Sequence, residues 1–376
     1  MDISTVRELE FSNVQGIYLN HAGISPLPAR TSAAVQLAAH SLTVDPVQYF
    51  MTEGLPRITS ARTRLAGLMG VPSEHLAFTR NTGHGLSIVA DSLDLKPGDN
   101  IVCLGIDYPA VVYPWNAQVW RGIEVRLVPA WADGSFAAED LAAAADINTK
   151  VFAISWVQFA TGFRADIKRI VDMAHSLGAL CVVDVIQGLG ALKYDNSLYG
   201  ADVVATGSHK WLLAAPGVGG LYVAPAALER MHLVNIGAIS VENPYNFDST
   251  VFDPKKTIQR AEEGSPNLFG LVGLDASISL IDEVGIEKIE ARVTELATVC
   301  IELLEKKGYV VSSSQAEGTM SGIVMFGHPT HANAEVMEAL KAAKVSCVER
   351  NGKIRFAPHL YNTAEEIARA VEALPV

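Results

Sequence analysis

Residues 206–213 read Thr206-Gly207-Ser208-His209-Lys210-Trp211-Leu212-Leu213. A short apolar strand, residues 202–205, leads into them, and a Gly- and Pro-rich turn, residues 214–223, closes the segment. A lysine at a strand end among apolar neighbours is poorly solvated. Desolvation lowers the pKa of its amine and makes it a nucleophile toward carbonyl groups. Most lysines are ordinary surface residues, so the rest of the chain must decide between the two interpretations of Lys210.

The composition of the chain limits the classes of protein and of partner that are possible. The chain has 376 residues, 49% of them hydrophobic and 19% charged, which suits a globular core rather than disorder. The net charge of -12 comes without a basic block, so nucleic acid is not an expected partner. A polar N-terminus and the lack of an apolar run of membrane-spanning length predict no membrane partner. The four cysteines, none in a CxxC pair, favour a reducing compartment, and we expect a cytoplasmic protein.

Strand-like and helix-like segments alternate through most of the chain. The expected strands are residues 75–79, 101–104, 124–128, 151–156, 180–184 and 202–205, and the expected helices are 29–42, 57–69, 86–93 and 167–177. Almost wholly apolar strands separated by helices predict an α/β fold whose mostly parallel sheet is covered on both faces. Ligands of such sheets bind beyond the carboxyl ends of the strands.

After about residue 270 the regular alternation of strands and helices ends. We expect a long helix, 274–306, with a break near Gly285, strands 309–312 and 322–326, helix 334–343, paired strands 345–349 and 353–357, and a last helix, 363–374. This pattern predicts a second, smaller α+β domain. The expected division is a large domain of residues 15–265 and a small domain of residues 1–14 and 266–376.

Candidate chemistry falls at the expected strand ends. Thr82 and Gly83 lie between a strand and a helix N-terminus, where backbone N–H groups and a hydroxyl can bind an anion. Asp184 ends a buried strand, where a carboxylate is costly unless a protonated group pairs with it. Tyr108 follows another strand and can cover a flat ring. Each has a simpler explanation. The Thr82–Gly83 pair and Asp184 can each be an ordinary helix cap, and Tyr108 can pack in the core.

Other classes of site lack their motifs. Lys193 occupies the place of the last glycine in the dinucleotide pattern that begins at Gly188, so GxGxxG fails. The histidines form no HExxH or other metal-ligand set, so no metal is expected, and neither a GxSxG elbow nor a Walker A loop is present. One ligand explains the remaining features. Pyridoxal 5′-phosphate (PLP) carries an aldehyde for a lysine, a ring nitrogen for a carboxylate and an anionic phosphate.

With these residues in place, the sequence resembles class V aminotransferase-fold enzymes, the cysteine desulfurase-like branch of the PLP-dependent family. The resemblance covers nearly the whole chain. Its most specific motifs are Ser208-His209-Lys210-Trp211, Asp184-x-x-Gln187 placed 26 residues before the lysine, and Arg355-x5-Tyr361-Asn362-Thr363. It implies PLP-dependent transferase fold type I, with a seven-stranded type of sheet in the large domain.

The resemblance also implies a role for each residue around the cofactor. Lys210 would form the Schiff base and move protons. Asp184 would pair with the ring nitrogen and Gln187 with the ring oxygen, and Tyr108 would stack on the ring. The phosphate would lie at Thr82, Gly83 and His209, with Ser208 a further candidate.

Substrate and subunit contacts follow from the same resemblance. Arg355 would bind the α-carboxylate of an amino-acid substrate, with Arg350 beside it. Asn20 and His21 match the N-terminal loop that lines the substrate site. Residues 260–267 resemble a stretch that reaches the neighbouring subunit's cofactor. This implies a homodimer with shared sites, in which Gly264 and Ser265 act in trans.

The sequence departs from the desulfurases at one loop. Those enzymes carry a loop cysteine between the positions of Arg350 and Arg355, where only four residues stand here. Cys347, on the preceding strand, is expected to be a small buried residue. Phe159 and Trp156 replace polar residues that are common in relatives, which suggests an altered wall around the site.

We therefore expect a PLP-dependent enzyme that acts at the α-carbon of an amino acid, an aminotransferase first. A β-lyase, of the C–S or kynureninase-like kind, and an epimerase are alternatives, because small geometric differences decide the fate of the α-carbanion. Two other classes stay open at this point: an inactive PLP-fold binding subunit, and a nicotinamide-dependent dehydrogenase on a Rossmann sheet. The sequence does not name the substrate.

Overall fold

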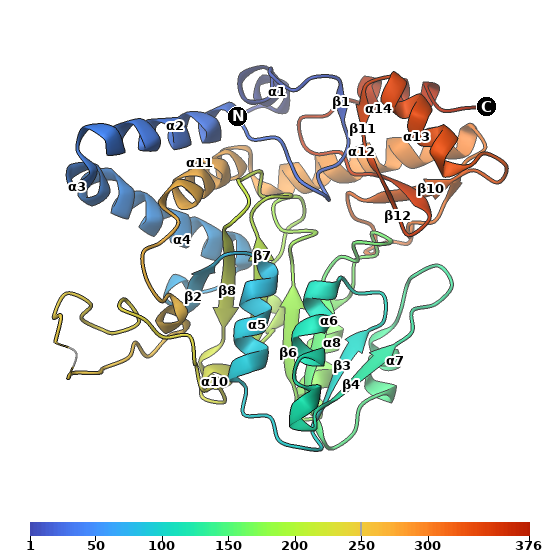
Figure 1. The fold of residues 1–376 in the computed structure, drawn as a ribbon. Coiled ribbons are helices and arrows are strands. Elements are labelled where there is room, and N and C mark those ends of the chain that lie inside the picture. Colours follow the sequence, from blue (N-terminus) through green and yellow to red (C-terminus); the bar gives the residue numbers. More distant parts are fainter. Residues whose placement is uncertain (249) are drawn as a thin grey trace.

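A sheet of seven strands forms the centre of the computed structural model, which describes residues 1–248 and 250–376 (Figure 1). The strand order is β2-β8-β7-β6-β5-β3-β4. The strands are β2 (Leu76–Thr79), β3 (Asn100–Leu104), β4 (Glu124–Val128), β5 (Thr149–Ser155), β6 (Leu180–Asp184), β7 (Val203–Gly207) and β8 (Gly219–Val223). The pairs β3–β4, β3–β5, β5–β6 and β6–β7 are parallel. The predicted mostly parallel sheet is confirmed.

Strand β8 is the exception, because the sequence predicted a turn over residues 214–223. It lies antiparallel between β7 and β2. Its two leading glycines serve close approach rather than a turn. A Cβ on Gly219 would lie 2.4 Å from the carbonyl oxygen of Thr206, and one on Gly220 would lie 2.7 Å from Leu65. Glycine in a strand commonly marks such a close approach.

Helices cover both faces of the sheet. Helices α5 (Thr82–Ser92) and α6 (Pro109–Asn116) lie on one face, and α8 (Ile167–Ser176) lies on the other (Figure 1). Successive residues of β6 belong to different apolar clusters. Val182 packs in the cluster that contains residues of α5 and α6, whereas Cys181 and Val183 pack in the cluster that contains residues of α8. A strand that is buried on both sides is expected to be apolar, which explains residues 180–183 of β6; Asp184, at its carboxyl end, is the exception.

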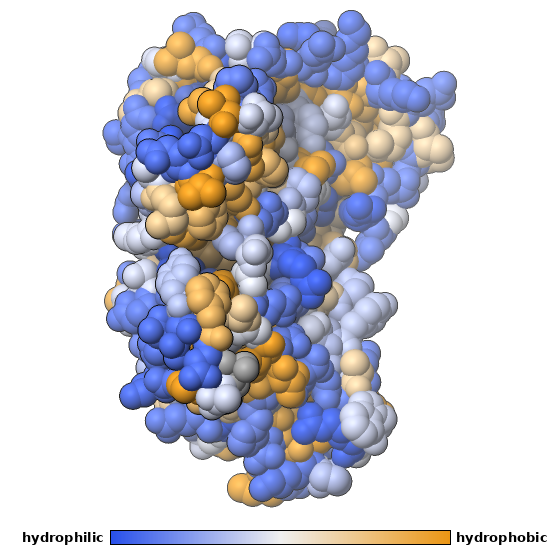
Figure 2. Space-filling view, turned by 60° about the vertical axis from the view of Figure 1, so that its left-hand side comes forward, coloured by the Kyte–Doolittle hydropathy of each residue, from blue (hydrophilic) through white to orange (hydrophobic). Residues whose placement is uncertain are grey.

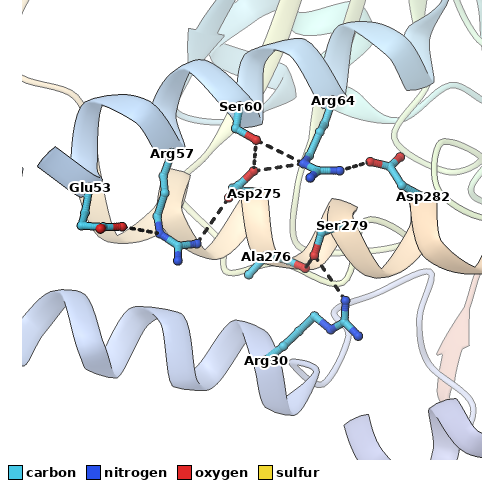
Figure 3. Close-up of polar contacts among 9 residues, drawn as sticks. All are labelled: Arg30, Glu53, Arg57, Ser60, Arg64, Asp275, Ala276, Ser279 and Asp282. Atoms are coloured by element: carbon cyan, nitrogen blue, oxygen red, sulfur yellow. Dashed lines mark hydrogen bonds and ion pairs between the residues drawn. The ribbon is translucent and has the colours of Figure 1, made fainter. Parts of the chain in front are cut away.

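The N-terminal helices pack against α11 (Leu268–Val284). They are α1 (Ile3–Glu10), α2 (Ala29–Val44), α3 (Pro46–Tyr49), the π-helix η1 (Phe50–Gly54) and α4 (Leu55–Met69). Figure 3 shows the polar contacts of this region: Asp275 of α11 accepts from Ser60 at 2.6 Å and from Arg64 at 3.2 Å, both on α4. Gly285, at φ 93°, separates α11 from α12 (Ile286–Lys306), which confirms the predicted break.

A second sheet holds the C-terminal part. Its order is β12-β13-β10-β9, all antiparallel, and a short parallel pair, β1–β11, lies apart from it. The strands are β1 (Ile17–Tyr18), β9 (Val310–Val311), β10 (Val324–Gly327), β11 (Val345–Ser346), β12 (Val348–Arg350) and β13 (Lys353–Phe356). The predicted strand 345–349 is thus split between two sheets. Asn351 and Gly352, both at positive φ, form the tight turn between β12 and β13.

The remaining helices are short or lie at the C-terminal end. They are α7 (Ala138–Ala143), α9 (Asn196–Tyr199), α10 (Pro225–Leu228), α13 (Asn333–Ala342) and α14 (Ala364–Glu372), with 3-10 turns η2 (Ser73–His75), η3 (Val119–Arg121) and η4 (Ile258–Ala261). Over the part of the chain described, no helix combines the length and apolar character needed to cross a membrane. The division into two domains stays a prediction.

Candidate active site

A cavity of about 440 Å³ lies beyond the carboxyl ends of β6 and β7. Segments far apart in the sequence line it: the loops after β3, β5, β6 and β7, the first turn of α5, the N-terminal loop and the hairpin β12–β13. The lining residues are Ala22, Gly23, Asn81, Thr82, Gly83, Tyr108, Ala110, Phe159, Asp184, Ile186, Gln187, His209, Lys210, Arg350 and Arg355. Most of the residues singled out in the sequence therefore meet in one place, at the edge of the sheet where ligands were expected.

Lys210 follows β7 and is buried. Its Nζ lies 5.5 Å from the centre of the Tyr108 ring. Burial lowers the pKa of the Lys210 amine to about 8; the Asp184 carboxylate opposes this shift, and the guanidinium groups of Arg355 and Arg350 add to it. An appreciable fraction of Lys210 is therefore a neutral, nucleophilic amine near neutral pH.

Asp184 is the last residue of β6 and is 2% exposed. Its Oδ1 accepts from the backbone N–H of Ile186 at 2.9 Å. Burial raises the pKa of this carboxyl group to about 6, and the N–H of Ile186 and the charge of Lys210 partly offset the rise. A buried carboxylate on a cavity wall is stabilised by a protonated ring nitrogen.

The first turn of α5 forms another corner of the cavity. Thr82 begins this helix, four residues earlier than predicted, and its buried hydroxyl has no partner among the described residues. The helix cap is Asn81, whose Oδ1 accepts from His84 N–H at 2.8 Å. Across from it, a Cβ on Gly207 would lie 2.9 Å from Ile186 and 3.3 Å from the Thr82 hydroxyl. The corner thus offers an unused donor at a helix N-terminus, which suits a phosphate.

His209 and two aromatic residues, Tyr108 and Phe159, also line this side of the cavity. Burial lowers the pKa of His209, and the charge of Lys210 lowers it further. The ring is therefore neutral at physiological pH and can donate one N–H. Tyr108 meets Phe159 edge-on, with ring centres 5.2 Å apart, and the two rings give this part of the wall an apolar, aromatic character.

Arg355 enters from β13 and is 2% exposed. Its Nη1 donates to the carbonyl oxygen of Phe159 at 3.2 Å and its Nη2 to Oδ1 of Asn20 at 3.4 Å, while its buried Nε has no partner among the described residues. Burial lowers the pKa of Arg355 to about 10, and the charge of Arg350, exposed at the rim, contributes. Among the described residues Arg355 thus has no carboxylate partner, and an anionic ligand would supply one.

Several predicted residues lie away from the wall. The Ser208 hydroxyl donates to the carbonyl oxygen of Ala215 at 2.6 Å, and it therefore supports the turn after Lys210. His21 is fully buried, with Nδ1 2.8 Å from the Ala357 carbonyl oxygen and Nε2 3.0 Å from the Tyr361 hydroxyl. Asn20 is not on the wall itself and lies behind it, against the wall residues Arg355 and Gly23.

Gly264 and Ser265 line a different cavity, of about 350 Å³. In this single chain they are therefore not part of the wall around Lys210. That Gly264 and Ser265 act on the neighbouring subunit's cofactor stays a prediction.

Several residues on the cavity wall or directly behind it were not predicted from the sequence. Asn81 could have been found, because an asparagine before Thr82 is a preferred helix cap. Gly207 and Ile186 belong to no recognisable sequence motif, because they matter only through the space that they leave between two loops. Trp211, next to Lys210 in the sequence, donates its indole N–H to Gln187, and no local pattern indicates this contact.

The residues present fit PLP. The cavity volume lies within the range of small-ligand sites. Around it stand a nucleophilic amine, a buried carboxylate, a phosphate-type corner and the ring of Tyr108, which match the aldehyde, the ring nitrogen, the phosphate and the ring of PLP.

Comparison with known proteins gives the same result. A family model described as "Aminotransferase class-V" matches residues 17–369. An uncharacterized aminotransferase, YcbU, of Bacillus subtilis is 27% identical, with 86% of this chain and 84% of that protein covered. A probable cysteine desulfurase of Halalkalibacterium halodurans is 30% identical, with 80% and 77% covered.

Solved structures share the fold. The cysteine desulfurase CsdA of Escherichia coli superimposes with a TM-score of 0.87 at 24% identity, covering 99% of this chain and 97% of that one. The cystine C–S lyase C-DES, in complex with cysteine persulfide, gives 0.86 at 22% identity, with 97% and 99% covered.

Proposed function

The chain belongs to the class-V aminotransferase family and is a PLP-dependent enzyme, and we propose that it is an aminotransferase acting on an amino acid. One observation carries the proposal. A single cavity holds a buried amine, Lys210, and a buried guanidinium, Arg355, that has no carboxylate partner in the described part of the chain. An amino acid brings the α-carbon and the carboxylate that these two groups require.

When bound, PLP supplies an aldehyde that condenses with amines and a ring that withdraws electrons from the α-carbon. Thr82, Gly83 and His209 would hold its phosphate, Asp184 its ring nitrogen and Gln187 its ring oxygen, with Tyr108 against the ring face. Asp184 would keep the ring nitrogen protonated, because a buried carboxylate favours a cationic partner.

Lys210 and Arg355 would act on the substrate. Arg355 holds the α-carboxylate through its unused N–H groups, and its bonds to Phe159 and Asn20 fix the plane of the guanidinium. This fixes the α-carbon relative to Lys210. The lowered pKa lets Nζ of Lys210 accept the α-proton near neutral pH and return it.

A β-lyase is the second candidate. Relatives named as probable cysteine desulfurases favour chemistry at a C–S bond. A persulfide on a loop cysteine does not fit this chain, because Asn351 and Gly352 alone connect Arg350 to Lys353. Cys347 contacts Met337, and burial raises the pKa of its thiol to about 12, so it is a poor nucleophile. A C–S lyase of this sequence would release the sulfur product directly.

We further propose a cytoplasmic homodimer in which Gly264 and Ser265 complete the partner's site. The segment between α10 and η4 supports it. Tyr245, Phe247 and Phe252 of this segment are 70%, 87% and 66% exposed, and Figure 2 shows apolar residues interrupting the hydrophilic surface on this side. A second subunit would cover them. The four cysteines are free, as in a reducing compartment.

The test is a panel of amino acids mixed with the PLP-loaded protein. Visible spectra report binding, and product analysis separates a keto acid without free ammonia, for an aminotransferase, from ammonia or sulfide, for a lyase. We expect Lys210→Ala to lose the visible band of the loaded protein. We expect Arg355→Ala to raise the amino-acid concentration needed for a spectral change about a hundredfold while PLP binding stays the same. An unchanged spectrum in Lys210→Ala contradicts the proposal.

A further inference from the structure

Trp211 follows the cavity lysine and is fully buried. Its indole Nε1 lies 3.2 Å from Oε1 of Gln187, whose Nε2 lies 3.2 Å from the carbonyl oxygen of Ala22. We propose that Trp211 is a positioning residue: its indole N–H fixes the Gln187 side-chain amide so that the amide offers an N–H donor to the cavity.

The orientation of the amide follows from chemistry. An indole nitrogen can only donate a hydrogen bond, and a backbone carbonyl oxygen can only accept one. The atom of Gln187 that faces Trp211 must therefore be the oxygen, and the atom that faces Ala22 must be the nitrogen. A flipped amide would meet a donor with a donor and an acceptor with an acceptor. Both of these residues are buried, so it is costly to leave either group without its hydrogen bond.

The second N–H of the Gln187 side-chain amide remains available to a ligand in the cavity. Its nitrogen carries two hydrogens, one of which goes to Ala22, and Gln187 lines the cavity. This inference rests on the proposed function, in which the ring oxygen of PLP is the acceptor. A donor at this position would withdraw electron density from the ring oxygen and would therefore lower the pKa of the group that the visible band of the loaded protein reports.

Trp211 itself has little freedom to move. A Cβ on Gly322 would lie 2.7 Å from its ring, so the indole fills the space that this glycine leaves. The Trp211 carbonyl oxygen lies 3.0 Å from Nε2 of His359, and Nδ1 of that histidine accepts from Leu360 N–H at 2.7 Å. Nε2 of His359 therefore carries the hydrogen and donates to Trp211. Backbone and side chain of Trp211 are thus both held.

The first experiment titrates the visible band of the PLP-loaded protein with pH. Trp211→Phe and Gln187→Ala should each raise the midpoint by about half a unit to one unit. The double variant should shift it no further than the larger single shift, because both changes remove one donor. Trp115→Phe is the matched control: it is equally buried, its indole nitrogen has no partner among the described residues, and it should leave the midpoint unchanged. An unshifted Trp211→Phe, or shifts that add in the double variant, would overturn the proposal.

A second readout needs neither PLP nor a folded Trp211 variant. In protein labelled with ¹⁵N-tryptophan, Gln187→Ala should move the indole N–H resonance of Trp211 upfield and leave that of Trp115 in place. A Trp211 resonance that does not move would refute the hydrogen bond. Because this measurement is made without cofactor, a protein that takes up no PLP would contradict the proposed function and leave this test intact.

Discussion

Lys210 shows at the residue scale how opposing effects set one pKa. Burial lowers the pKa to about 8, and the Asp184 carboxylate acts in the opposite direction. For cofactor-free protein mixed with PLP and trapped by reduction, we expect labelling of Lys210 to rise with pH and to level off above about 8. Asp184→Asn should lower this midpoint, because it removes the charge that favours the ammonium form. Mass spectrometry of the peptides measures both.

Lys193 is the internal control for this titration. It is half exposed and paired with Glu287 at 3.0 Å, and that ion pair raises its pKa above the ordinary lysine value. Its labelling should therefore keep rising at pH values where that of Lys210 has already levelled off. Parallel curves for the two lysines would contradict the lowered pKa of Lys210.

At the scale of elements, the end of β7 and the start of α5 leave a space beside the Thr82 hydroxyl, where the phosphate of PLP is expected to bind. Gly207→Ala would place a methyl group 2.9 Å from Ile186 and 3.3 Å from the Thr82 hydroxyl. The end of the Ile186 side chain can shift by part of this distance, so we expect PLP affinity to fall about tenfold rather than to vanish. Equilibrium titration of the cofactor-free variant with PLP measures this change.

Gly67→Ala in α4 is the matched comparison. Its added methyl group would meet nothing within 4 Å, and the residue is exposed in the last turn of the helix. The free energy of unfolding should rise by about 0.5–1 kcal/mol, because alanine favours the helix. PLP affinity should stay as it is. Equal affinities in the Gly207 and Gly67 variants would rule out the crowding of the corner.

At the scale of the whole molecule, the exposed aromatic residues between α10 and η4 favour a second subunit. Light scattering after size exclusion should give twice the chain mass of 40.2 kDa at micromolar concentration. Phe247→Ser removes an apolar side chain that is 87% exposed and should weaken the dimer.

Trp120→Ser provides the control for that substitution. Trp120 is 84% exposed on η3, away from the segment in question, and the dimer should be unaffected by its loss. A wild-type protein that elutes as a monomer would refute the homodimer, and equal effects of the two substitutions would show that this segment is not the interface.

Much of the fold was predictable because its signals are local. Apolar runs between helical patterns gave the parallel strands, and Gly285 gave the break between α11 and α12. The prediction was wrong at β8, where Gly219 and Gly220 look like turn residues. Their use in a strand depends on Thr206 and Leu65, which lie against them in space but not in sequence.

The sequence by itself determined the family and the cofactor, because the groups that PLP requires stand at fixed spacings at strand ends: Lys210, Asp184, Gln187 and the Thr82–Gly83 pair. Only the tertiary structure decided how Lys210 is tuned, which amide group Gln187 presents and what holds Arg355. These properties depend on burial and on partners such as Trp211, Asn20 and Phe159. Distances of 3.2 to 3.4 Å between such groups are set by the packing of whole elements, which no local pattern encodes.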